Sequence, residues 1–248
     1  MYRNSIVLLF CLSTLPVISY AACSDPAAPM VNWEDCDKSK QDLQKTDLSS
    51  AVLLRANFGA TNFKKARLKH ADFGSANLNS AILDGVKAKK ARFVGANLIK
   101  ASIKKARLNL SNFDRANLSQ AVITQSNLSD VSFYNTIFSE ANISQSTFNN
   151  SNFEQADLTE VNAKGAAFQQ AIFSSAILED GNFQDADFYR AKLDNAELSG
   201  ADFSNANLQG ADLHNAEISN TNFSNAKLDN AIWINHKRCR PGSVGVCK

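Results

Sequence analysis

An apolar residue, bulky at all but two positions, recurs at every fifth position of this chain from Leu43 to Trp233, and the phase never changes. The stretch 41–235 divides into 39 consecutive units of five residues, whose central residues are 17 Leu, 15 Phe, 4 Ile, 2 Ala and 1 Trp. The residue two positions before the centre is Ala in 26 of the 39 units, and the residue between them is often Asn or Asp. A period this dominant has to be explained before secondary structure is assigned.

Neither regular backbone conformation explains a period of five. An α-helix turns about 100° per residue, so centres five apart would spiral around its surface instead of forming one stripe. A continuous strand alternates its faces with period two, so an odd step would place successive centres on opposite sides. The pattern fits a coil in which each unit is a short extended segment, followed by a corner. Asn, Asp, Ser and Gly near the corners suit such turns.

Units such as Ala96-Asn97-Leu98-Ile99-Lys100 and Ala201-Asp202-Phe203-Ser204-Asn205 resemble those of the pentapeptide-repeat family. The resemblance covers residues 41–235 and extends towards Val31. It implies an all-β fold, a right-handed quadrilateral parallel β-helix with four units in each coil. Four units contain 20 residues, so the repeats would form about ten coils.

Four units per coil would stack residues that lie 20 apart in sequence. One of the four resulting columns would contain six successive Phe residues, from Phe73 to Phe173, with Trp33 and Trp233 at its ends. A rise of about 4.8 Å per coil is suitable for stacked aromatic rings and makes the rod about 48 Å long.

The N-terminus has the features of a secretory signal. Arg3 provides a basic start, residues 6–15 are mostly apolar, Pro16 interrupts them, and residues 19–21 form a small-x-small cleavage site. Cleavage after Ala21 would leave 227 residues, exported to the periplasm or secreted, without a transmembrane segment. A membrane anchor would need about 20 apolar residues, roughly twice the number here. A lipoprotein acylated at Cys23 is another alternative, although Tyr20 stands where such signals usually carry Leu.

Four of the five cysteines remain after cleavage, as two local pairs, Cys23 with Cys36 and Cys239 with Cys247. An even number in an exported chain indicates disulfides, and the distant ends of a rigid rod permit only the local pairing. The predicted organisation is a signal peptide at 1–21, a disulfide-linked N-terminal cap at 22–40, the β-helix at 41–235 and a disulfide-linked C-terminal cap at 236–248. Lys38 stands where a buried centre is expected, so we expect the first coil to be open or distorted there.

The sequence contains no recognisable catalytic or cofactor-binding motif. It lacks a nucleotide-binding loop, HExxH, GxSxG and a Cys/His dyad, and its three histidines (His70, His214 and His236) are far apart. The sequence also lacks the CxxC and CxxH spacings that are typical of metal sites. We therefore expect a protein that is not an enzyme and has no cofactor or metal.

Charge is distributed unevenly along the repeats. Residues 41–120 carry 15 Lys or Arg against 5 Asp or Glu, a net charge of +10, whereas residues 121–235 carry 4 against 15, a net charge of −11. The basic half could meet phosphates of a lipid surface or another polyanion, although a solvated surface that keeps the rod soluble would look the same. The candidate anion-binding residues are Lys64, Lys65, Arg67, Lys69, Lys87, Lys89, Lys90, Arg92, Lys104, Lys105 and Arg107.

The sequence thus predicts a non-catalytic, exported scaffold that presents flat faces to an unknown protein or an anionic envelope component. Head-to-tail self-association of the basic and acidic halves is a further hypothesis. A second hypothesis comes from family members that mimic duplex DNA and protect type II topoisomerases, but export and the basic half argue against it and against a nucleic-acid partner. An enzyme with an unrecognised site is the third.

Overall fold

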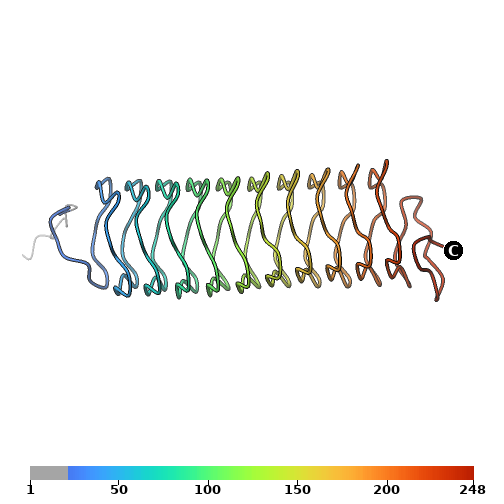
Figure 1. Cartoon of the computed structure of the whole chain (residues 1–248), viewed down its shortest axis with the longest axis horizontal. Helices are drawn as coiled ribbons and strands as arrows, with labels where there is room; N and C mark the ends of the chain where they lie inside the picture. The colour runs from blue at the N-terminus through green and yellow to red at the C-terminus, as the bar shows by residue number, and fades with distance from the viewer. Residues whose placement is uncertain (1–21) are drawn as a thin grey trace, which may run out of the picture.

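The computed structural model describes residues 22–248, which wind in successive coils along one long axis (Figure 1). The N-terminal and C-terminal ends of the described chain lie at opposite ends of this rod (Figure 1). The predicted signal peptide, residues 1–21, lies outside the described residues. Within 22–248 the chain contains no helix and no strand longer than one bridging residue, because every extended segment ends at a corner after a few residues.

Parallel β-bridges join each coil to the next. Every parallel bridge pairs a residue with the one 20 positions later, from Asn32 with Val52 at one end to Asp212 with Ile232 at the other. The bridging residue is always the one just before the buried centre. Each coil therefore consists of four five-residue sides, as the family resemblance implies, and the bridges begin at residue 32, within the segment expected to form the cap.

The corners depend on a left-handed backbone conformation at the fifth residue of each unit. This residue has a positive φ in every unit from Lys45 to Asn230, for example 61° at Lys90 and 59° at Glu140. Asn or Asp at the bridging position stabilises many corners, since its side chain accepts a hydrogen bond from the backbone N–H two residues later. Asn57 Oδ1 accepts from Gly59 N at 3.1 Å, and Asp202 Oδ1 accepts from Ser204 N at 2.8 Å.

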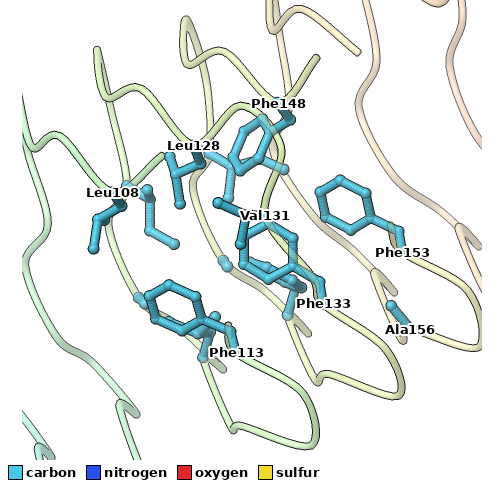
Figure 2. Packing of buried hydrophobic residues seen from close by; sticks show 14 of the residues in the cluster. Leu108, Phe113, Leu128, Val131, Phe133, Phe148, Phe153 and Ala156 are labelled. Carbon is cyan, nitrogen blue, oxygen red and sulfur yellow. The ribbon is translucent and has the colours of Figure 1, made fainter. Parts of the chain in front are cut away.

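The core is a set of columns in which buried side chains stack from coil to coil. Phe113, Phe133 and Phe153 follow one another along the rod in Figure 2. The rings from Phe73 to Phe173 form the predicted column, with centroids 4.5–5.4 Å apart at each step and planes within 25° of parallel. The predicted stack is confirmed, and such offset contacts add stability beyond the burial of apolar area.

Small residues two positions before the centre fill the remaining space in the core. Most are Ala, and where a buried Ser or Thr replaces Ala its hydroxyl still donates a hydrogen bond. Thr136 Oγ1 donates to the carbonyl oxygen of Phe113 at 2.7 Å, and Ser151 Oγ donates to that of Leu128 at 2.7 Å. No buried side-chain N or O atom of the described residues lacks a partner.

Lys38 does not open the first coil, so that expectation was wrong. Asp37 forms a regular bridge with Asn57, and Lys38 is 6% exposed. Its Nζ donates to the carbonyl oxygen of Cys23 at 2.6 Å and lies 4.0 Å from the centre of the Trp33 ring. The hydrogen bond and the aromatic face partly compensate for burying the charge, although burial still lowers the pKa of Lys38.

The C-terminal segment folds back over the last coil. Val244 and Arg238 form antiparallel bridges with Lys227 and Ile232, so this segment covers part of an edge that would otherwise be open to further strands. Cysteine Sγ atoms lie at disulfide distance at both ends, 1.94 Å apart in Cys23–Cys36 and 2.07 Å apart in Cys239–Cys247. The local pairing is therefore supported, and a Cys23 engaged in this way is not available for acylation.

Candidate anion-binding face

The coil brings ten of the eleven candidate cations to one side of the rod. Arg67, Lys87 and Arg107 follow one another through consecutive bridges and form the middle of this side. The turns that bound it carry the other cations. We call this set the basic face: Lys64, Lys65, Arg67, Lys69, Lys87, Lys89, Lys90, Lys104, Lys105 and Arg107. It spans three consecutive coils, at 64–70, 84–90 and 104–110.

The cations of the basic face are exposed and nearly all free of carboxylate partners. All ten are exposed, because their side chains point away from the core. Within the described chain, Arg67 alone among them forms an ion pair, with Asp47 at 3.3 Å. Asp84 is the one acidic residue in these three segments. Its Oδ1 already accepts hydrogen bonds from Ser102 Oγ at 2.7 Å and from the backbone N of Lys104 at 3.0 Å.

A glycine leaves a hollow along one edge of this face. Gly85 occupies a corner with φ +67° between two corners that carry paired lysines, Lys64–Lys65 and Lys104–Lys105. These residues and Asp84 line a hollow of about 320 Å³. A Cβ atom on residue 85 would lie 3.4 Å from Lys65 Cγ, so a side chain here would occupy the space between the lysines. The hollow could hold an anionic group between four ammonium groups.

Arg92 is the candidate that the structure separates from the others. It lies on the neighbouring side of the coil, bridged to Asp72 and Asn112, and its Nε is 3.1 Å from Asp72 Oδ2. The basic face therefore consists of the candidate cations without Arg92. Arg92 is five residues after Lys87, which is one side of the coil further along.

The structure also brings together two histidines that are distant in sequence. The rings of His214 and His236 stack with centroids 5.1 Å apart, and His214 Nδ1 lies 2.7 Å from Asp212 Oδ1. Sequence reasoning missed this pair because His236 lies beyond the last regular unit, where the period of five no longer predicts position. Among residues 22–248, no group of three or more His, Cys, Asp or Glu side chains is arranged to hold a metal ion. No helix of that part is long and apolar enough to cross a membrane.

The four-sided coil and its periodic core define a solenoid of the β-helical class. Six overlapping matches to the family model described as pentapeptide repeats cover residues 42–79, 76–114, 111–150, 136–174, 173–205 and 196–232. Because these matches together span 42–232, most of the 248 residues, the chain belongs to the pentapeptide repeat family.

Solved structures of the same family resemble this chain. One is HetL, a pentapeptide repeat protein involved in heterocyst differentiation regulation from the cyanobacterium Nostoc sp. strain PCC 7120. HetL is 23% identical, with 77% of this chain and 91% of HetL covered and a TM-score of 0.65. Rfr23 from the cyanobacterium Cyanothece 51142 is 27% identical over 45% of this chain and 63% of its own, with a TM-score of 0.35. QnrB1, a plasmid-mediated fluoroquinolone resistance protein, is 21% identical over 72% and 90%, with a TM-score of 0.28. No curated protein sequence matches the chain.

The likeness to HetL is one of fold, and it implies a right-handed quadrilateral β-helix.

Proposed function

We propose that this protein is a non-catalytic, exported scaffold of about ten coils whose basic face binds an anionic component of the cell envelope. The observation that carries the proposal is the confinement of ten cations to one side of three adjacent coils, with a single ion pair among them. A regular array of cations on a rigid surface attracts a polyanion, and binding does not incur the free-energy cost of rearranging the protein.

Export determines which anionic partner the basic face would meet. Two cysteine pairs at disulfide distance fit an oxidising compartment outside the cytoplasm. Phosphate-bearing lipids and polysaccharides are the abundant polyanions of such a surface. The spacing of the cations is set by the coil, at about 4.8 Å along the rod, so a group with several closely spaced phosphates would meet several ammonium groups at once.

Titration against anionic surfaces tests the proposal. The oxidised protein is titrated against lipopolysaccharide, and separately against vesicles of an anionic phospholipid, at about 10 mM and about 1 M ionic strength, where the Debye length is about 30 Å and about 3 Å. A variant with Lys87→Gln, Lys89→Gln and Lys90→Gln removes three charges from the basic face. A variant with Lys164→Gln, Lys192→Gln and Lys227→Gln makes the same change in charge elsewhere.

We expect binding at low ionic strength that is lost at high ionic strength. Each lysine near an anionic lipid surface is worth about 1 kcal/mol, so the triple substitution on the basic face should weaken vesicle binding about 100-fold. The control variant should bind as the wild type does. Equal losses in both variants would show that net charge, not the basic face, drives binding. Absence of binding at low ionic strength would overturn the proposal.

A DNA mimic is the second candidate, and the acidic half of the rod is the observation that favours it. A mimic needs a surface that repeats the negative charges of a duplex. Inhibition of a type II topoisomerase by the purified protein, unaffected by the triple lysine substitution, would support this candidate over the first.

A further inference from the structure

The acidic residues of the C-terminal half are gathered on one side of the rod, as the cations of the N-terminal half are. Five successive coils contribute the segments 134–140, 154–160, 174–180, 194–200 and 214–220, which stack through bridges such as Asp157 with Ile177 and Ile177 with Glu197. These segments contain nine Asp or Glu and no Lys or Arg. We call this set the acidic face: Glu140, Glu154, Asp157, Glu160, Glu179, Asp180, Asp194, Glu197 and Glu217.

The acidic face and the basic face are on opposite sides of the coil. Residues 20 apart stack, so Asp157 and Glu197 share a column with Asn97, which lies ten residues after Lys87. Ten residues are two of the four five-residue sides, or half a coil. The basic face and the acidic face therefore point in opposite directions, and they are also displaced from each other along the rod.

The charges on the two faces are equal and opposite, and among the described residues only that of Arg67 is engaged in an ion pair. Ten cations and Asp84 give the basic face a net charge of +9, and the nine carboxylates give the acidic face a net charge of −9. None of these nine carboxylates forms an ion pair with a described residue. On the same two sides, the other coils carry acidic and basic residues in similar numbers. Each patch is therefore local and of one sign.

We infer that the partner of the acidic face is the basic face of a second copy of this chain. Contact between flat faces of rigid rods requires no change in conformation, and matched charge of opposite sign steers their approach. The middle of the basic face is near Lys87 and that of the acidic face is near Ile177, 90 residues or four and a half coils later. Parallel rods would therefore associate side by side with a stagger of about 22 Å.

This contact is heterologous, because each copy contributes a different face. Since the two faces point in opposite directions, a copy that is bound through its basic face still has its acidic face exposed to solvent. Such contacts do not close into a dimer but continue into an open array. Association of this kind uses the sides of the rod and leaves the two caps free.

Charge-swapped variants test the inference directly. The first variant carries Lys87→Glu, Lys89→Glu, Lys90→Glu and Lys105→Glu, which changes the basic face from +9 to +1. The second carries Glu140→Lys, Glu160→Lys, Asp180→Lys and Glu197→Lys, which changes the acidic face from −9 to −1. Positive-φ corners already accept both residue types, as Lys65 and Glu160 show. Sedimentation velocity at about 10 mM and about 1 M ionic strength measures the assembly state.

The wild type should form species larger than a dimer at low ionic strength and sediment as a monomer at high ionic strength. Each variant alone should remain monomeric at both. An equimolar mixture should form a dimer and nothing larger, because only the intact acidic face of the first variant and the intact basic face of the second can pair. A monomeric wild type at low ionic strength, or a mixture that remains monomeric, would overturn the inference.

The inference shares the basic face with the proposed function, but the two can fail separately. The second variant retains the whole basic face, gains positive charge and does not cover that face by self-association, so it should bind anionic vesicles at least as tightly as the wild type while failing to self-associate. If it self-associates as the wild type does, the acidic face is not the contact. Absence of vesicle binding by the second variant, whose basic face is not covered by another copy, would overturn the proposed function alone.

Discussion

Replacement of Phe113 by Ala tests whether the stacked column holds the coils together. Phe113 is 1% exposed, and its ring lies 4.5 Å from that of Phe93 and 5.4 Å from that of Phe133, between centroids. Truncating a buried Phe to Ala costs about 3–5 kcal/mol, of which the two lost ring contacts account for about 0.5–1.5 kcal/mol each. For a chain of this size, a loss of this magnitude lowers the melting temperature by about 6–20 °C.

Thermal and urea-induced unfolding, followed by circular dichroism, would measure the loss. Phe113→Leu is the comparison variant, because Leu occupies many equivalent centres and fills most of the same volume; since it still loses both ring contacts, it should cost about 1–3 kcal/mol, less than Ala. Repeat proteins are stabilised by contacts between neighbouring units, so a cavity at Phe113 weakens the interfaces on both sides of its coil. An Ala variant that melts within about 1 °C of the wild type would refute the column as a source of stability.

Three further predictions follow from local contacts. Gly181→Ala should destabilise the protein by about 1–3 kcal/mol, because the new Cβ would lie 2.5 Å from Cε2 of the buried Phe183 ring. This is expected although Ala is the commonest residue at equivalent positions. An unchanged urea midpoint would contradict it. Reduction of the cysteine pairs should lower stability by about 2–4 kcal/mol each, measured by unfolding with and without reductant, whereas equal midpoints would show that the caps do not depend on them. Acid should destabilise the protein. Burial opposes ionisation of Asp157, but hydrogen bonds from Thr159 and Ser139 together outweigh it and lower the pKa of Asp157 below its ordinary value of 3.8. The stabilisation is therefore present above the unfolded pKa and is lost as the pH falls through the folded one. Asp157→Asn should reduce the slope of stability against pH in that range, and an unchanged slope would exclude this carboxylate as a contributor.

The periodic part of the fold was predictable because each unit repeats the same physical requirement. A large residue fills the inside of the coil, a small one leaves room for it, and Asn or Asp stabilises the corner. The stack from Phe73 to Phe173 followed once residues 20 apart were placed in register. The units at the ends were harder to predict. Lys38 looked like a defect because the carbonyl group that accepts its hydrogen bond belongs to Cys23, in a segment that precedes the repeat.

The sequence by itself determined the repeat, the inward-facing side chains and the excess of cations in one half and carboxylates in the other. All of these are local, since a five-residue unit specifies which residue points inward and the order of residues specifies charge along the rod. The tertiary structure decided which charges share a side. Its 20-residue bridges set the basic face opposite the acidic face, excluded Arg92 from the former, and brought His214 to His236. A side of the coil is assembled from segments 20 residues apart, so its composition depends on the register between coils, which hydrogen bonds between their backbones fix.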